Sequence, residues 1–250
     1  MSKIAIIGPA HPLRGGGLTT FNHRLAKEFL NQGNSCVIYS FSLQYPSFLF
    51  PGTSQFTDDP APSGLTIRPV INSVNPFNWV KIGRMIRDEK PDLIIVRFWI
   101  PFMGPALGTI LRRVRKNRYS RIICIADNVK PHEVRIGDRL LTRYFIKPCQ
   151  AFITMSENVM KDLRYFEKDK PAILLPHPIY DNFGATIPKQ EARQQLGIPS
   201  DEKVILFFGF IRKYKGLDLL LEAMSDERIR RAGIKLLIAG EFYADEQWYQ

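Results

Sequence analysis

Short runs of apolar residues alternate along the chain with longer stretches in which apolar side chains recur every three or four positions. The runs predict buried strands of a parallel sheet, and the longer stretches predict helices with one apolar face. The predicted strands are 3–8, 36–41, 65–70, 93–98, 121–126, 151–155, 172–175, 204–208 and 235–239. The predicted helices follow residue 17, span 76–89, begin near 105 and at 156, and span 191–196 and 217–231. Strands that alternate with helices predict an α/β fold with a doubly wound parallel sheet.

Prolines at positions 176, 178, 188 and 199 indicate where one domain ends and another begins. We expect residues 1–178 to form a complete Rossmann-like domain, 179–202 to form a linker, and 203–250 to begin a second Rossmann-like domain. About two βα units fit into a segment of that length, fewer than a doubly wound domain needs. The second domain is therefore expected to be incomplete, and the sequence to be a fragment.

An irregular stretch, residues 43–64, interrupts the alternating pattern. Long insertions of this kind often serve as binding loops or lids. Its aromatic residues are Tyr45, Phe48, Phe50 and Phe56. These aromatic side chains could contact an apolar acceptor. Alternatively, they could pack the loop against its own domain.

Composition narrows the class of protein. A hydrophobic content of 45% without a long apolar run predicts a globular chain, and three cysteines at no metal-binding spacing predict reduced core residues of a cytoplasmic protein. The net charge of +11 favours an anionic partner, which could be nucleic acid, an anionic membrane or a phosphorylated substrate. Nucleic acid is disfavoured because aromatic residues do not alternate with the cations.

The positive charge is concentrated in residues 112–121, which contain no acidic residue. The segment ends a predicted helix whose apolar face carries Leu107, Ile110, Leu111 and Val114. Such a basic amphipathic helix fits an anionic membrane surface, with Arg112, Arg113, Arg115, Lys116 and Arg118 as the contacting cations. The alternative is a helix packed on the core, with a solvated basic face.

Ligands of open parallel sheets bind beyond the carboxyl ends of the strands. In the second domain this rule selects residues 209–215, where Gly209 ends a strand and Arg212, Lys213 and Lys215 precede a helix. Fixed cations beside the positive end of a helix suit a diphosphate, whereas the alternative is a solvated basic turn.

In the first domain the same rule selects the glycines 15–17, Asp127 and His132. A carboxylate at position 127 could orient a sugar hydroxyl or stabilise positive charge that develops on a sugar ring, and His132 could bind a hydroxyl or a departing phosphate. Both residues also have a plausible structural role. The Asp127 carboxylate could cap a turn, and His132 could fix the loop with a hydrogen bond.

The segments Asp127–His132, 177–183 and 207–218 together resemble family-4-type retaining glycosyltransferases. The resemblance implies the GT-B fold, two Rossmann-like domains that face a cleft, and sugar transfer from a nucleotide diphosphate sugar to a saccharide or lipid-linked acceptor. It also implies that no metal or other cofactor is needed. Lys215 falls on the lysine that holds the diphosphate in that family, whereas Phe210 stands at the position of the family's arginine and Arg212 follows two residues later.

The resemblance assigns a set of site residues. The catalytic candidates are Asp127 and His132, and the donor-binding candidates are Gly15, Gly16, Gly17, Gly209, Arg212, Lys215 and Glu241. The family's Glu-x7-Glu motif is absent after Glu241, so we expect the 250-residue chain itself to be inactive or nearly so. The expected location is cytoplasmic, peripheral on the inner face of the membrane. The alternative function is a non-catalytic protein that binds polyanions or nucleotides.

Overall fold

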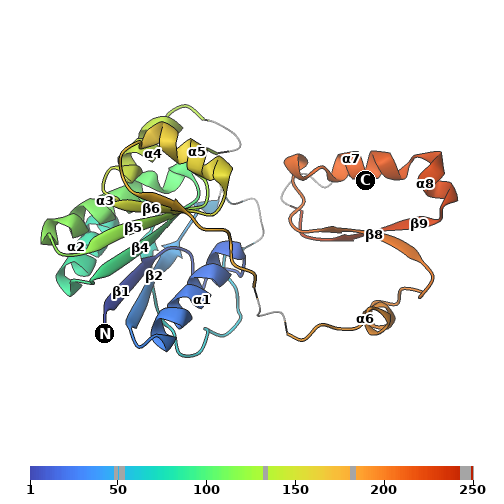
Figure 1. The fold of residues 1–250 in the computed structure, drawn as a ribbon, viewed down its shortest axis with the longest axis horizontal. Coiled ribbons are helices and arrows are strands. Elements are labelled where there is room, and N and C mark those ends of the chain that lie inside the picture. Colours follow the sequence, from blue (N-terminus) through green and yellow to red (C-terminus); the bar gives the residue numbers. More distant parts are fainter. Residues whose placement is uncertain (48–49, 51–53, 132–134, 181–183, 243–248, 250) are drawn as a thin grey trace. The chain divides into compact units, whose positions relative to one another are not determined.

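The computed structural model describes residues 1–47, 50, 54–131, 135–180, 184–242 and 249. The chain divides into two compact units: the first comprises Met1–Phe50 and Ser54–Pro178, and the second continues from Ile179 (Figure 1).

The first unit is built around a seven-stranded parallel sheet. Its strands are β1 (Lys3–Ile7), β2 (Ser35–Leu43), β3 (Thr66–Asn72), β4 (Leu93–Phe98), β5 (Arg121–Ala126), β6 (Ala151–Thr154) and β7 (Ala172–Leu174). Their order is β3-β2-β1-β4-β5-β6-β7, and every neighbouring pair is parallel. The direction of winding reverses between β1 and β4, which is where open α/β sheets bind ligands. The predicted doubly wound parallel sheet is confirmed.

Helices cover both faces of this sheet. They are α1 (Gly17–Asn31), α2 (Pro76–Glu89), α3 (Gly104–Val114), α4 (Asp138–Ile146) and α5 (Glu157–Phe166), with short 3-10 turns η2 (Pro101–Met103) and η3 (Arg115–Asn117) beside α3. The sequence pattern predicted four of these five α-helices and missed α4. This helix carries apolar residues on two faces, since Phe145 and Ile146 are buried whereas Leu140 and Tyr144 are exposed, so it shows no single apolar stripe.

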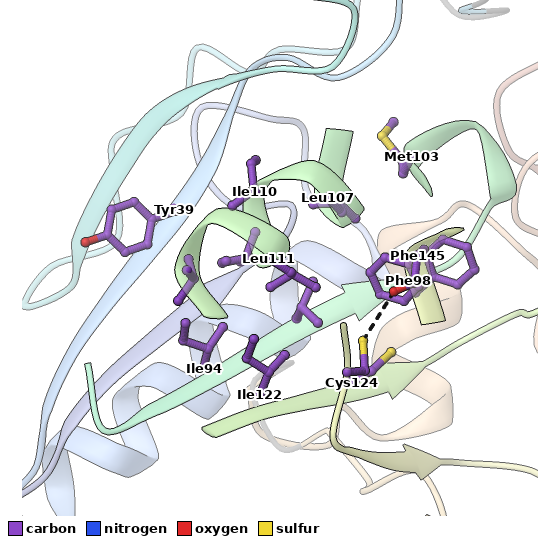
Figure 2. Close-up of a cluster of buried hydrophobic side chains, with 14 of the residues drawn as sticks. Tyr39, Ile94, Phe98, Met103, Leu107, Ile110, Leu111, Ile122, Cys124 and Phe145 are labelled. Carbon is purple, nitrogen blue, oxygen red and sulfur yellow. Dashed lines mark hydrogen bonds between the residues drawn. The ribbon is translucent and has the colours of Figure 1, made fainter. Parts of the chain in front are cut away.

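Successive side chains of a strand point to opposite faces of the sheet, so the core is divided into two layers. In β1, Ile4 and Ile6 pack with α1, whereas Ala5 and Ile7 belong to the larger cluster on the opposite face. Figure 2 shows part of the larger cluster, in which α3 lies over β4 and β5. There the rings of Phe98 and Phe145 stack with centroids 4.0 Å apart.

The stretch between β2 and β3 is held to its own unit where the structure describes it. The Gln55 side chain accepts hydrogen bonds from the backbone of Gln44 and Tyr45 and donates one to the Tyr45 carbonyl oxygen. The Tyr45 ring stacks on Phe102, and Trp99 Nε1 donates to its hydroxyl at 2.7 Å. These contacts favour the packing role for Tyr45; Phe48 lies outside the described residues.

The second unit contains a βαβ arrangement. Its elements are α6 (Lys189–Gln195), β8 (Lys203–Phe208), η4 (Lys213–Lys215), α7 (Leu217–Met224), α8 (Glu227–Arg231) and β9 (Ile234–Ala239), with β8 and β9 paired in parallel. The prediction of one helix over 217–231 is wrong, because the helix divides at Ser225 and Asp226. Ser225 Oγ donates to the Glu222 carbonyl oxygen, and the Asp226 carboxylate accepts from the Arg228 N–H, so polar side chains replace backbone bonds there.

Two further predictions concern the whole chain. All three cysteines, Cys36, Cys124 and Cys149, are free and buried. Within the parts of the chain that are described, no helix combines the length and apolar character that crossing a bilayer requires.

Candidate functional site

The turn after β8 is shaped by two glycines. Gly209 has a φ of 120°, which side-chain-bearing residues rarely adopt, and a Cβ on Gly240 would collide with the Gly209 carbonyl oxygen. The ends of β8 and β9 therefore approach closely. The Ile211 N–H donates to the Glu241 carbonyl oxygen at 2.9 Å, and Ile211 itself is buried. Glu241 thus helps to fix the turn through its backbone.

The cations of this turn stand between the buried Ile211 and the buried Leu217. Lys213 and Lys215 are exposed and Arg212 is half-buried, while Gly216, at φ 74°, is the capping residue just before α7. The Lys215 ammonium lies 5.6 Å from the centre of the Tyr214 ring. Buried residues at either end fix the backbone while the lysine side chains reach solvent, as an anion-binding turn beside a helix start requires.

Arg97 and Asp127 form a buried ion pair at the carboxyl ends of β4 and β5. Arg97 Nε donates to Asp127 Oδ2 at 3.0 Å, and its Nη2 donates to Oδ1. The Arg97 side chain is 1% exposed and that of Asp127 15%. The guanidinium also lies 4.2 Å from the centre of the Phe21 ring, so it is enclosed between a carboxylate and an aromatic face.

The protonation of Asp127 is set by opposing influences. Burial raises the pKa of its carboxyl above the ordinary value, and this outweighs the charge of Arg97, its hydrogen bonds and the charge of His177, which lower it. His177 also packs edge-on against Phe21 at 5.5 Å, and its Nδ1 lies 2.7 Å from the Pro178 carbonyl oxygen. Asp127 is therefore held by an arginine in a partly dehydrated place.

Gly8, at the end of β1, leaves room for this pair. A Cβ on Gly8 would come within 2.8 Å of Asn22 Nδ2 and 2.9 Å of Arg97 Cγ. Asn22 Nδ2 donates to the Pro9 carbonyl oxygen, whereas Asn22 Oδ1, Arg97 Nη1 and Thr154 Oγ1 are buried without a hydrogen-bond partner among the described residues. Buried polar atoms of this kind commonly bond to water or a ligand, so Asn22 and Arg97 retain bonding capacity at the switch point of the sheet.

The glycines 15–17 differ from Gly8. All three are exposed, and a Cβ on any of them would meet nothing within 4 Å. Packing against the described chain therefore does not require glycine at these three positions. The other sequence candidate in this unit, His132, lies outside the described residues.

The basic residues at the end of α3 are less suited to membrane binding than their sequence suggested. Leu107, Ile110, Leu111 and Val114 are all buried, so the core occupies the apolar face of α3. Arg112 donates to the carbonyl oxygens of Gly108 and Tyr144, and its guanidinium lies 3.6 Å from the centre of the Tyr144 ring. This arrangement favours the alternative of a core helix with a solvated basic end.

Arg97 and Asn22 are functional candidates that the sequence analysis did not select. The available signal was an arginine in the otherwise apolar strand Leu93–Phe98, since a charge in a buried strand requires a partner. Among the described residues, no group of three or more His, Cys, Asp or Glu side chains could hold a metal ion.

Comparison with known proteins finds a family to which the second unit is similar. Residues 188–249, which include the turn at 209–215, match the family model described as "Glycosyl transferases group 1". A lipopolysaccharide 1,2-N-acetylglucosaminetransferase of Salmonella typhimurium is 42% identical over 60 residues, which are 24% of this chain and 16% of that protein. A D-inositol 3-phosphate glycosyltransferase of Segniliparus rotundus is 42% identical over 53 residues, which are 21% of this chain and 12% of that protein.

Solved glycosyltransferases match almost the whole chain. The Anabaena protein Alr3699/HepE, solved with UDP and glucose, has a TM-score of 0.66 at 15% identity and covers 100% of this chain. The catalytic domain of starch synthase IV from Arabidopsis thaliana, solved with ADP and acarbose, has a TM-score of 0.58 at 13% identity and covers 99%. The expected GT-B fold is thus confirmed. The chain spans 64% and 70% of these two structures and a much smaller share of the curated relatives.

Proposed function

We propose that the chain is part of a retaining glycosyltransferase that moves a sugar from a nucleotide diphosphate sugar to a saccharide or lipid-linked acceptor. The observation that carries the proposal is the group 1 match over residues 188–249, which includes a rigid turn with Arg212, Lys213 and Lys215 at a helix start. The Anabaena and Arabidopsis structures, which were solved with UDP and ADP, support a nucleotide donor.

Lys215 and Arg212 are the proposed diphosphate ligands. Negative charge on the leaving diphosphate grows as the bond to the sugar breaks, so a cation fixed nearby stabilises the transition state more than the ground state. Lys215 immediately precedes Gly216, the capping residue just before α7, so its charge adds to the positive end of that helix. Arg212, half-buried at the start of η4, takes the place of the arginine that the family carries where Phe210 stands here.

Asp127 is proposed to act on a sugar hydroxyl or on positive charge at the sugar ring. A carboxylate offers about four acceptor positions, and Arg97 occupies one on each oxygen, so Asp127 keeps the capacity to accept from a hydroxyl. Glycines 15–17, His132 and Glu241 remain proposed contacts of the donor or acceptor, and neither a metal nor a cofactor is part of the proposal. The proposed location is cytoplasmic and peripheral on a membrane.

Calorimetric titration of the chain with UDP and with ADP tests the donor half of the proposal. We expect saturable binding that Lys215→Ala weakens and that Lys213→Ala, the matched control in the same turn, leaves nearly unchanged. Filter binding to RNA supplies the contrasting measurement. Tight RNA binding with no response to either nucleotide would favour a polyanion-binding protein and overturn the proposal.

A further inference from the structure

Helix α4 presents a solvent-exposed surface that none of the site residues uses. Its outward side chains form two parallel rows with a spacing of four residues. The apolar row is Ile136, Leu140 and Tyr144, and the basic row is Arg139, Arg143 and Lys147. Residues four apart lie on one side of a helix, so Leu140 and Tyr144 share one side of α4, and Arg139 and Arg143 share another. Ile136 precedes the helix, and Lys147 caps its end. We call these six residues the α4 outer face.

The exposure of the apolar row is unusual for a packed helix. Ile136 is fully exposed, Leu140 is 70% exposed and Tyr144 is 38% exposed. The opposite side of the helix is already occupied, since Thr142, Phe145 and Ile146 are buried. Tyr144 is partly covered, because its ring contacts the Arg112 guanidinium and its hydroxyl lies 2.8 Å from Thr109 Oγ1. Ile136 and Leu140 remain in water, and exposed apolar side chains of this kind point to a partner.

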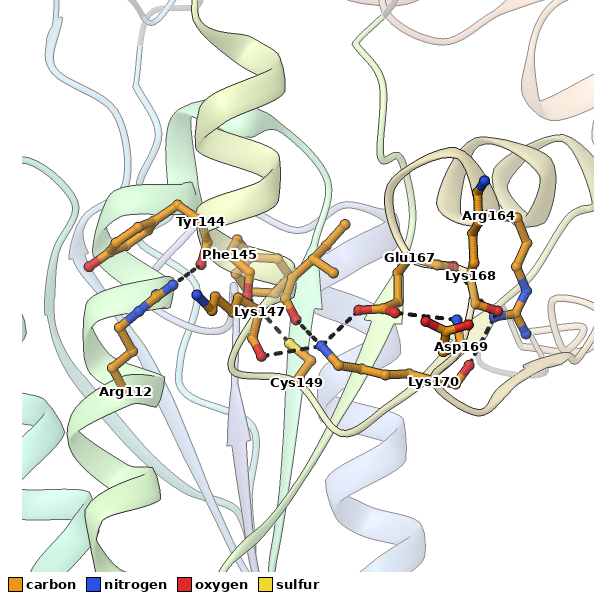
Figure 3. A network of polar contacts seen from close by, with 11 residues as sticks. Arg112, Tyr144, Phe145, Lys147, Cys149, Arg164, Glu167, Lys168, Asp169 and Lys170 are labelled. Atoms are coloured by element: carbon orange, nitrogen blue, oxygen red, sulfur yellow. Dashed lines mark hydrogen bonds and ion pairs between the residues drawn. The ribbon is translucent and has the colours of Figure 1, made fainter.

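The helix cannot turn these side chains inward, because it is fixed at several points. Arg112 Nη2 donates to the Tyr144 carbonyl oxygen at 2.6 Å, and Lys170 Nζ donates to the carbonyl oxygens of Ile146 and Lys147 (Figure 3). A Cβ on Gly104 would come within 2.5 Å of the Leu141 carbonyl oxygen, so α3 and α4 are in close contact. The outer face is thus a rigid surface.

The charged side chains of the α4 outer face are all basic. Asp138 is the sole acid in residues 135–147, and its carboxylate accepts from the Arg135 N–H at the start of the helix. Arg139 donates to the Tyr165 hydroxyl and lies 5.2 Å from the centre of that ring. Neither Arg143 nor Lys147 has an ion-pair partner among the residues that the structure describes. A ridge of apolar side chains flanked only by cations is complementary to a bilayer with anionic headgroups.

We propose that the α4 outer face docks onto an anionic lipid surface, with Leu140 at the headgroup–acyl boundary and the basic row on the headgroups. Nucleic acid fits less well, because the exposed aromatic ring, that of Tyr144, is already covered by the Arg112 guanidinium and cannot stack on a base. The surface does not depend on the proposed sugar transfer.

Flotation of the 250-residue chain with vesicles of phosphatidylcholine mixed with phosphatidylglycerol tests the proposal. Arg139→Gln, Arg143→Gln and Lys147→Gln together should lower the partition coefficient on the order of 100-fold, since each cation near such a surface contributes several-fold. The matched control changes Arg115, Lys116 and Arg118 to Gln, which removes the same charge from the end of α3. The control should retain most of the binding.

A direct measurement does not depend on the charge variants. With Leu140→Trp, vesicles should shift the emission of the introduced tryptophan to shorter wavelength, and brominated acyl chains should quench it. Equal losses in both triple variants would mean that net charge alone attracts the chain. Equal losses, no quenching of the introduced tryptophan, or absence of vesicle binding together with capture by another protein would each overturn the proposal.

Discussion

Arg97 in the first unit and the lysines of the turn at 209–215 in the second unit are used in opposite ways. In the first unit, Arg97 is buried, and its guanidinium pairs with Asp127 and lies against the ring of Phe21. In the second unit, Lys213 and Lys215 extend from a fixed turn into solvent. A buried pair holds its own geometry, whereas an exposed cation is available to a ligand. The difference predicts that a change at Arg97 acts on stability and that a change at Lys215 acts on binding.

The largest effect on stability is expected from Arg97→Met. This change leaves the Asp127 carboxylate buried without its partner, which should cost about 3–5 kcal/mol of unfolding free energy. Urea denaturation followed by circular dichroism measures it. Adding Asp127→Asn should recover a substantial part, because the uncompensated charge is then removed. A loss below about 1 kcal/mol in the single variant would show that the pair is not formed as described.

The largest effect on function is expected from Lys215→Ala, measured on a form of the protein that transfers sugar. It should lower kcat/KM on the order of 100-fold, which corresponds to about 3 kcal/mol of transition-state stabilisation, while the unfolding free energy changes by less than about 0.5 kcal/mol. Lys213→Ala is the control and should have a much smaller effect. Equal small losses for Arg212→Ala, Lys213→Ala and Lys215→Ala would make the turn a plain basic loop.

The buried character of the first unit also predicts how its stability depends on pH. Burial, together with the neighbouring charge of His11, lowers the pKa of His23 to about 4, and its Nε2 accepts a hydrogen bond from the His11 backbone N–H. The unfolded chain therefore takes up a proton at higher pH than the folded one. The stabilising contribution is complete above the ordinary histidine pKa and is lost as the pH falls towards 4.

Denaturation between pH 7 and pH 4 should show His23 contributing about 2 kcal/mol of that loss, a value reduced because the ring is only partly buried. His23→Gln should flatten the pH dependence by this amount. His11→Gln is the matched control, because it removes the neighbouring charge and keeps the burial, so most of the slope should remain. An unchanged slope in His23→Gln would contradict the assignment.

The smallest effects are expected at the helix starts. Ser156 Oγ accepts from the Val159 N–H at the start of α5, and Asp226 Oδ1 accepts from the Arg228 N–H at the start of α8. Ser156→Ala and Asp226→Ala should each cost about 1 kcal/mol. Hydrogen exchange should show the loss of protection in α5 for the first variant and in α8 for the second. Loss in neither helix would mean that these caps contribute nothing measurable.

Local pattern predicted most of the elements because the signal for each lies within a few residues. The predicted ranges 76–89, 93–98 and 121–126 coincide with α2, β4 and β5. The break between α7 and α8 could not be predicted from the sequence. The sequence signal there is Ser225-Asp226, and both residue types occur inside helices as well as at their ends. Their hydrogen bonds decide between the two outcomes.

The chain's alternation of strands and helices, its basic turn at 209–215 and its glycines 15–17 were determined by the sequence alone, since periodicity and residue type express them without reference to distant parts. The tertiary structure decided the partnership of Arg97 with Asp127, which are far apart in the sequence, because it depends on β4 lying beside β5. It also decided which side of α4 faces water. A helix with apolar residues on two sides can bury either one, and contacts from α3 and Lys170 select the side that is buried.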